Sequence, residues 1–304
     1  MSETPHFSIV VPTRARPSLA ASCVRAVLAQ VDPPAFEMIV ADQSDDAATL
    51  EAVAAEAGGD PRVRVERMAV RGRSKALNAA FPIARADWIV VMDDDCRPAP
   101  DWLAALARAV VALPAQTVVV GRVVAGPKGP GAADPPAILD EPSPAEVRGR
   151  SFRDWIYPNL TFPREAIAAI GGYDERLGPG TPIPGAEDND WGYRLLCAGW
   201  TIAYRPEPAV VHEAWRTIEE RLALKRSYGL GQGGFYAKHI AKADPFILLR
   251  FLHDLGRQAK GWTVAALSAR SLDARGHLAY AGGLIAGAVA MGELIVRGVP
   301  ERAP

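Results

Sequence analysis

The chain has 304 residues, of which 49% are apolar and 23% charged, and its formal net charge is -1 at pH 7. This composition excludes a disordered, collagen-like or disulfide-rich chain, and the length allows either one large domain with an appendage or two domains. Residues 1–215 carry 21 Lys and Arg against 28 Asp and Glu, whereas residues 216–304 carry 13 against 7. The basic second part has no nucleic-acid recognition motif, so we expect no nucleic-acid partner.

Strand-like and helix-like segments alternate over the first 92 residues. Short runs rich in β-branched and aromatic residues are typical of buried strands, and the segments between them repeat apolar residues at helical spacing. We expect strands at 7–11, 36–40, 63–67 and 88–92, and helices at 18–30, 47–57 and 74–84. This alternation predicts an α/β fold whose mostly parallel central sheet is flanked by helices on both faces.

Three consecutive carboxylates, Asp93, Asp94 and Asp95, follow the expected strand at 88–92. Ionised carboxylates this close together repel one another unless a divalent cation and its phosphate ligand compensate their charge. The C-terminal edge of an open α/β sheet is also where ligands bind. The cluster therefore predicts a metal and phosphate site, and the alternative is an acidic turn that caps the helix beginning near Pro100.

Polar residues end the first two strands in the same way. Pro12, Thr13 and Arg14 follow the first strand, and Asp42 and Ser44 follow the second. Neighbouring parallel strands that end in polar loops form a crevice where a nucleotide can lie. Ordinary turn and helix-capping chemistry is the alternative.

Positive charge gathers where the helix at 74–84 begins. Arg71, Arg73 and Lys75 lie near its N-terminus, and the free N–H groups of that terminus favour anions. A diphosphate suits this environment, and a solvated basic loop is the alternative.

A second acidic cluster, from Glu187 to Asp190, opens a further helix after a loop rich in Gly and Pro. The helix dipole favours carboxylates in a first turn, so a structural role is open, but a carboxylate such as Asp188 could also act as a general base. His212 follows an apolar pair at a strand end. Its imidazole either has a structural role or completes the coordination of a cation held by Asp95.

The region after residue 215 has helical patterns throughout. In 245–267, one face carries only apolar residues, namely Leu248, Leu252, Leu255, Ala259 and Trp262. Residues 278–296 contain a single charge. Three alternatives stay open for this segment: it lies in or dips into a bilayer, it packs on the protein, or it spans a membrane. We expect an α/β domain at 1–215 and a basic, apolar helical region at 216–304 that contacts a membrane peripherally through 245–297.

The three cysteines, Cys23, Cys96 and Cys197, are widely spaced and form no C-x-x-C pair. We therefore expect free thiols in a reducing compartment. The first residues lack the basic region of a secretory signal and lead directly into a strand, so we expect a cytoplasmic protein at the inner face of the cell membrane.

The order and spacing of these motifs resemble the family-2 glycosyltransferases with the GT-A fold, over about residues 7–215. The matching segments are Ser8–Arg14, Val40–Ser44, Gly72–Asn78, Met92–Pro98 with Asp101–Leu103, Gly171–Asp174, and Glu187–Asp188. One segment departs from the pattern: the family's helix-opening motif usually reads G-L-S-x-A-R-N-x-G, whereas this chain has Arg73 and Leu77 in place of its Leu and Arg.

The resemblance implies specific roles. The nucleotide site would consist of Pro12, Thr13, Arg14, Asp42, Ser44, Arg73, Lys75, Asn78, Asp93 and Asp94. Mn²⁺ or Mg²⁺ would be held by Asp95 and Asp93, with His212 as a further ligand. The acidic pair of the family maps to Glu187 and Asp188, of which Asp188 matches the catalytic base.

The implied protein is an inverting glycosyltransferase. It would move a sugar from a nucleoside-diphosphate sugar, first of all a UDP-sugar, to a hydroxyl of a glycan or lipid-linked acceptor in the synthesis of envelope glycan, polysaccharide or glycolipid. One alternative is a sugar nucleotidyltransferase, although residues 12–17 lack the glycines of its phosphate loop. The other is a non-catalytic, membrane-associated protein that binds a nucleotide or a cation.

Overall fold

The computed structural model describes residues 4–129, 131–132, 135 and 137–302. This part of the chain folds into two compact units, which are described separately below. The first takes its residues from 1–130, 135–172 and 192–215, and the second from 131–134, 173–191 and 216–304. The second unit thus joins the C-terminal helical region to residues 173–191.

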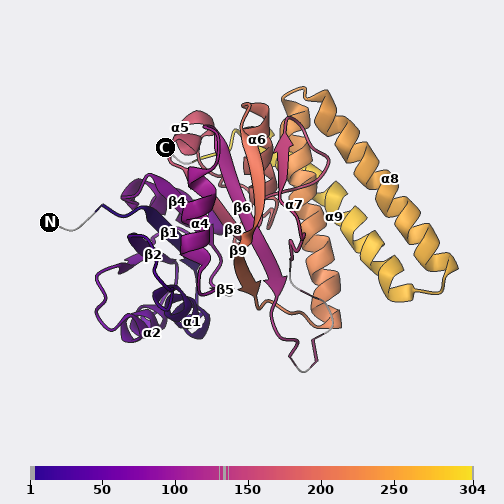
Figure 1. Cartoon of the computed structure of the whole chain (residues 1–304). Coiled ribbons are helices and arrows are strands. Elements are labelled where there is room, and N and C mark those ends of the chain that lie inside the picture. The colour runs from indigo at the N-terminus through magenta and orange to yellow at the C-terminus, as the bar shows by residue number, and fades with distance from the viewer. Residues whose placement is uncertain (1–3, 130, 133–134, 136, 303–304) are drawn as a thin grey trace. The chain divides into compact units, whose positions relative to one another are not determined.

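A mixed sheet forms the centre of the first unit (Figure 1). Among the described residues it has nine strands, in the order β3-β2-β1-β4-β8-β6-β9-β5, with β7 paired to β9. The strands are β1 (Phe7–Thr13), β2 (Phe36–Asp42), β3 (Val63–Arg67), β4 (Trp88–Met92), β5 (Cys96–Pro98), β6 (Thr117–Ala125), β7 (Ala145–Arg148), β8 (Asn159–Pro163) and β9 (Thr201–His212).

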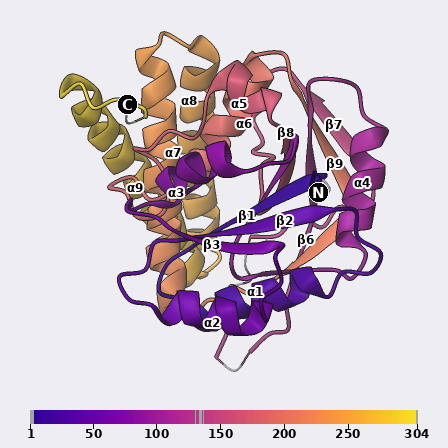
Figure 2. The same cartoon turned by 90° about the vertical axis from the view of Figure 1, so that its left-hand side faces the viewer.

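The N-terminal half of the sheet has the predicted parallel order, because β3, β2, β1 and β4 pair in parallel. Parallel crossovers are right-handed. The steps from β1 to β2 to β3 therefore place α1 (Pro17–Leu28) and α2 (Ala48–Ala57) on one face, and the return to β4 places α3 (Arg73–Ala80) on the other. Figure 2 shows this arrangement, with α3 across the strands from α1 and α2.

Antiparallel pairs complete the sheet, which is mixed as a whole. Strand β8 runs antiparallel to β4 and β6, and β9 runs parallel to β6 but antiparallel to β5 and β7. Asn159 fixes this junction, since its amide nitrogen donates to the carbonyls of Arg122 and Pro208 and its oxygen accepts from the indole of Trp102. A Cβ on Gly121 would lie 2.1 Å from that amide, so glycine is required there. The unit also contains α4 (Trp102–Val111) and α5 (Glu165–Ile170).

Long helices form most of the second unit: α7 (Ile218–Ala241), α8 (Pro245–Leu267) and α9 (Ser271–Val296). Thr217 begins α7 through a capping box with Glu220, and Asp244 begins α8 by accepting from two backbone N–H groups of its first turn. Helix α6 (Glu187–Cys197) begins in this unit and ends in the first.

Glycines allow α7 and α9 to approach each other closely. A Cβ on Gly287 would lie 1.9 Å from the carbonyl oxygen of Leu230, and one on Gly233 would lie 2.0 Å from that of Leu284. Gly283 and Gly287 therefore face α7, which corresponds to one of the three alternatives left open for residues 278–296, packing on the protein. Of the helices that the structure describes, α9 is the one whose length and composition suffice to cross a membrane, with a mean hydropathy of 1.6 and 22% of its most apolar stretch buried.

The cysteines are free thiols, as their spacing predicts. Cys23 and Cys96 are buried, and burial raises the pKa of Cys23 to about 12 and the pKa of Cys96 well above its ordinary value. Cys197, at the end of α6, is exposed.

Replacing Gly287 by Ala tests the packing of α9 on α7. The added methyl group would overlap the backbone of α7, and we expect the free energy of unfolding to fall by about 1–3 kcal/mol. Urea denaturation followed by far-UV circular dichroism measures this change. Gly282→Ala is the matched control, because nothing lies within 4 Å of a Cβ at that position. Equal stability of the two variants would contradict the described packing.

Candidate active site

The ends of β1 and β2 lie side by side at one edge of the sheet. Thr13 and Asp42, the last residues of the two strands, are opposite each other in the parallel register. Asp42 Oδ1 accepts from the backbone N–H of Ser44, 2.9 Å away, and also from the Ser44 hydroxyl. Its other oxygen, Oδ2, is buried and has no hydrogen-bond partner among the described residues. A donor on a bound nucleotide would suit this carboxylate.

Asp94 follows β4, the strand that pairs with β1 on its other side, and it contacts residues at and after the end of β1. Its Oδ2 accepts from the Thr13 hydroxyl at 2.7 Å, and its Oδ1 lies 2.9 Å from Nη1 of Arg16. Burial raises the pKa of Asp94, whereas Thr13 and Arg16 oppose that rise. Two of the sequence-predicted residues, Thr13 and Asp94, are thus in direct contact.

Arg16 is a residue of this site that the sequence reasoning missed. Its Nη1 contacts both Asp94 and, at 3.4 Å, Asp95. Burial lowers its pKa, but these carboxylates raise it above the ordinary value. The preceding residue, Ala15, has a φ of +51°, a left-handed conformation that is uncommon outside glycine. The charge of the loop was visible in the sequence, but the turn at Ala15, on which the position of Arg16 depends, was not.

Asp95 and His212 lie together in a potential cation site. Strand β5 pairs with β9 so that Cys96 is opposite His212, and Nε2 of His212 lies 3.3 Å from Oδ1 of Asp95. The other imidazole nitrogen, Nδ1, lies 3.0 Å from the carbonyl oxygen of Ala137. Burial lowers the pKa of His212, but the hydrogen bond and charge of Asp95 raise it above its ordinary value. The ligand atoms of Asp95, Cys96 and His212 all lie within 4.8 Å of one another.

Asp93, the first carboxylate of the cluster, contacts Arg73. From the first position of α3, the Arg73 guanidinium lies 3.1 Å from Oδ1 of Asp93. Gln43 orders the preceding loop, since its side-chain oxygen accepts from the N–H of Gly72 at 2.7 Å. Arg71 contacts the Gln43 carbonyl. The predicted basic end of α3 therefore lies against the predicted acidic cluster.

Four other predicted nucleotide residues have different surroundings. Arg14 is about half exposed and reaches Asp45 only at 3.9 Å, and Lys75 is half-buried on the first turn of α3. Asn78 is buried, and a Cβ on Gly172 would lie 2.2 Å from its amide oxygen. Asn78 therefore packs against the Gly171–Asp174 motif, while Pro12 is buried within β1.

Glu187 and Asp188 belong to the first turn of α6, in the second unit. Glu187 is buried and Asp188 is half-buried. The start of this helix is fixed by a stacked pair, Tyr173 and Trp191, whose ring centroids lie 5.5 Å apart. The proposed base therefore stands on a tightly packed helical turn.

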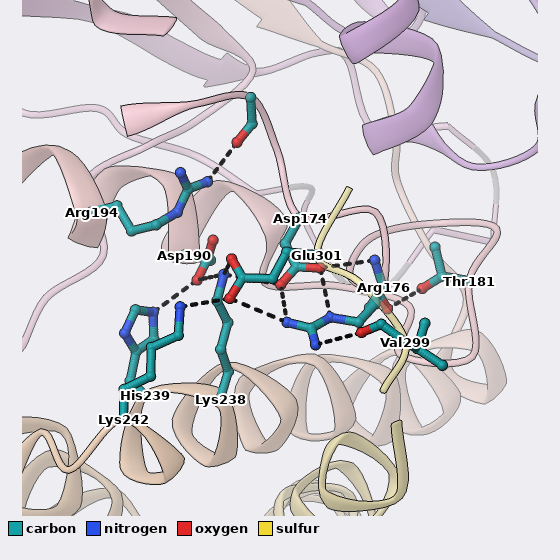
Figure 3. Close-up of polar contacts among 11 residues, drawn as sticks. Asp174, Arg176, Thr181, Asp190, Arg194, Lys238, His239, Lys242, Val299 and Glu301 are labelled. Atoms are coloured by element: carbon teal, nitrogen blue, oxygen red, sulfur yellow. Dashed lines mark hydrogen bonds and ion pairs between the residues drawn. The ribbon is translucent and has the colours of Figure 1, made fainter. Parts of the chain in front are cut away.

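A buried ion-pair network holds the same turn to α7 (Figure 3). Oδ1 of Asp190 lies 2.8 Å from Nζ of Lys238 and 2.8 Å from Nε2 of His239. Lys238, only 1% exposed, also contacts Asp174 at 2.9 Å and Glu301 at 3.1 Å. Because Asp190 is two residues after Asp188, this network fixes the backbone that carries the predicted catalytic pair.

The C-terminal segment, through Val299 and Glu301, adds further contacts to this network. The backbone carbonyl of Glu301 accepts from the N–H of Glu175, and Nη1 of Arg176 donates to the carbonyl of Val299 at 3.2 Å. Burial raises the pKa of Glu301, but Lys238 and Lys242 together lower it to about 2. The carboxylate is therefore ionised at neutral pH and attracts the buried ammonium group.

Comparison with curated proteins gives partial matches. The pre-mycofactocin glycosyltransferase of Mycobacterium tuberculosis is 24% identical over 188 residues, which are 59% of this chain and 38% of that protein. The uncharacterized protein y4gI of Sinorhizobium fredii is 39% identical over 106 residues, which are 34% of this chain and 12% of that protein. The chain therefore spans less than half the length of these two relatives.

Solved structures match over most of the chain. The mannosyltransferase PcManGT from Pyrobaculum calidifontis, in complex with GDP-Man and Mn²⁺, has 20% identity and a TM-score of 0.56, over 98% of this chain and 77% of its own. S. aureus TarS 1–349, in complex with UDP, has 18% identity and a TM-score of 0.54, over 97% of this chain and 93% of its own. These likenesses show the fold alone.

The mixed sheet flanked by helices, with C-terminal helices after it, is the GT-A glycosyltransferase fold, as predicted. The chain belongs to glycosyl transferase family 2, whose sequence profile matches residues 8–167. The family prediction is thereby confirmed. The roles of the individual site residues stay predictions.

Replacing Lys238 by Met tests the network that supports α6. The change would leave Asp174 and Asp190 buried beside each other without their common cation, and we expect a loss of about 3–5 kcal/mol in the free energy of unfolding. Chemical denaturation measures this loss. Lys242→Met is the matched control, since the Lys242 side chain is 54% exposed and its pair should contribute less than about 1 kcal/mol. Similar stability of both variants would contradict the importance of the buried network.

Proposed function

We propose that the protein is an inverting glycosyltransferase that moves a sugar from a nucleoside-diphosphate sugar to an acceptor hydroxyl. The observation that carries this proposal is the acidic edge of the sheet, where Asp94 is held by Thr13 and Arg16, and Asp95 lies beside His212. The family, which the chain shares with known glycosyltransferases, supports the same reaction class.

The side chains at this edge suit a divalent cation. Asp95 and His212 offer a carboxylate oxygen and an imidazole nitrogen only 3.3 Å apart, a separation that one ion can bridge. The Cys96 thiol is a poor third ligand, since burial raises its pKa well above the ordinary value and keeps the thiol protonated. An imidazole in the set favours Mn²⁺ over Mg²⁺. Mn²⁺ also accompanies the sugar nucleotide in PcManGT. When bound, the cation would neutralise negative charge on the departing diphosphate.

Residues of the first unit would bind the nucleotide. Asp42 has an enclosed oxygen without a partner in the described part of the chain, and it would accept a hydrogen bond from the base or the ribose. Arg73 would reach the diphosphate from the N-terminus of α3, where the helix dipole adds to its charge. Lys75 would assist from the same turn.

The chemical step is assigned to Asp188 on α6. Its carboxylate would take the proton of the acceptor hydroxyl as that oxygen attacks the anomeric carbon. The bond from this carbon to the diphosphate oxygen would break at the same time, and the nucleoside diphosphate would leave with the bonding electrons. Attack from the face opposite the leaving group inverts the anomeric centre.

A UDP-sugar is our first choice of donor, and a glycan or a lipid-linked glycan is our choice of acceptor. UDP and UDP-GlcNAc are bound by TarS, whereas GDP-Man is bound by PcManGT. A thermal-shift panel of UDP-, GDP- and dTDP-sugars, with and without Mn²⁺, would identify the donor, because a ligand of the native state raises the melting temperature.

We place the reaction in the cytoplasm, at the inner face of the cell membrane, in the synthesis of envelope glycan.

Asp188→Asn tests the proposed base. We expect kcat for release of UDP from the preferred UDP-sugar to fall by about 10²–10⁴, because general-base catalysis contributes this much, while donor affinity stays unchanged. Donor turnover is followed by an assay for free UDP, and affinity by calorimetry. Asp101→Asn, at a side chain that is 65% exposed, is the control and should keep full activity. Full turnover by Asp188→Asn would remove Asp188 from the mechanism.

The pH dependence of Mn²⁺ binding tests His212. A cation binds the neutral imidazole, and Asp95 raises the pKa of His212 above 6.5. Mn²⁺ affinity should therefore be level at alkaline pH and fall by up to about tenfold per pH unit below that pKa. The electron paramagnetic resonance signal of free Mn²⁺ measures the affinity. His212→Ala should weaken binding and His253→Ala, an exposed position on α8, should not. The same affinity in both variants would exclude His212 as a ligand.

A further inference from the structure

Helix α8 of the second unit buries polar side chains and exposes apolar ones. Its buried residues include Arg250, Asp254 and Gln258, three polar side chains spaced four residues apart. In water an amphipathic helix buries its apolar face and exposes its polar one. The polar face of α8 instead packs against its neighbouring helices.

The buried polar side chains of α8 are well partnered. Asp254, 5% exposed, accepts from the hydroxyls of Tyr280 at 3.2 Å and Tyr236 at 3.4 Å. Gln258 Oε1 lies 2.8 Å from Nδ1 of His277 on α9. These specific contacts fix the rotation of α8 about its own axis, so the helix cannot turn its apolar face inward without breaking them.

The apolar stripe of α8 is therefore exposed. The residues that the sequence places on one face recur at spacings of three and four, which keeps them in one row along the helix. Leu252 is 56% exposed, Trp262 42% and Leu248 44%. Exposed apolar residues arranged in a row, rather than scattered singly, mark an interaction surface.

Helix α9 continues this pattern. The face with Gly283 and Gly287 lies against α7, while Leu278, Ile285 and Val289 on other sides of the helix are more than half exposed. Because its glycine face is held by α7, α9 would have to give up this packing to cross a membrane. Figure 1 shows α8 and α9 as a helical hairpin.

Positive charge surrounds the turn of this hairpin. Lys260, Arg270 and Arg275 are exposed there, and so is Arg257, which pairs with Asp254. The one acidic residue between 255 and 277, Asp273, lies 3.1 Å from Arg221 and 4.0 Å from Arg270, so the basic residues outnumber it. A basic surface beside apolar side chains, with a Trp among them, matches the interface of an anionic bilayer. A symmetric contact between two copies of the chain through this surface would bring the basic residues of both copies into one interface, where like charges repel.

We propose that the hairpin of α8 and α9 binds the surface of a bilayer that contains anionic lipids. The apolar row of α8 and the outward side chains of α9 enter the interfacial layer, and the basic residues of the turn contact the lipid headgroups. This inference does not depend on the transferase reaction, since it concerns neither nucleotide nor acceptor.

Flotation of the full chain with vesicles tests the proposal. Vesicles of phosphatidylglycerol and phosphatidylcholine in equal parts should bind the protein, and vesicles of phosphatidylcholine alone should bind it weakly. The double variant Leu252→Gln and Trp262→Gln should lower the partition coefficient by about tenfold or more. Lys260→Gln should lower it by about fivefold on the anionic vesicles only.

The control is Val111→Gln on α4, at a residue that is 82% exposed in the first unit; it should leave vesicle binding unchanged. Because the substituted side chains are exposed, the melting temperatures should match that of the wild type. Absence of binding to the anionic vesicles, or equal binding by the double variant and the control, would overturn the proposal. So would a dimer in light scattering that the double variant dissociates while no form binds vesicles, because the surface would then join two copies of the chain.

Discussion

The mutual repulsion of Asp93, Asp94 and Asp95 is the physical constraint that organises the first unit. Three adjacent carboxylates at a strand end are stable only when partners from elsewhere approach them. Asp93 contacts Arg73 at the start of α3, Asp94 contacts Arg16 before α1, and Asp95 lies near both Arg16 and His212 at the end of β9. The partners thus come from three different segments. The acidic sequence therefore draws separate parts of the chain to one edge of the sheet.

The second unit depends on a related balance of charge. Lys238 is buried, and a buried ammonium is costly unless it is closely paired. Its partners Asp174, Asp190 and Glu301 come from a loop, from α6 and from the C-terminal segment. Because one ammonium group contacts all three carboxylates, segments far apart in the sequence depend on one another. The turn that carries Asp188 gains its rigidity from this dependence.

Much of the fold could be predicted, because buried parallel strands are short apolar runs and the helices between them keep a regular spacing. The grouping of Thr13, Asp42 and Asp94 followed from their positions at strand ends. Arg16 could not be predicted, since its direction depends on the left-handed backbone at Ala15. The ion pairs of Lys238 could not be predicted from the sequence either, because its partners come from distant segments. Amphipathic spacing identified the faces of α8, but it could not tell which face meets the protein.

The contrast among the three cysteines has a practical consequence. Cys23 and Cys96 are enclosed and resist deprotonation, whereas Cys197 is exposed at the end of α6. Maleimide reagents attack accessible thiolates. A fluorophore or spin label should therefore attach at one position in the natural sequence, without engineered mutations. Attached to the helix that begins with the predicted catalytic pair, such a probe would report on donor or acceptor occupancy in real time.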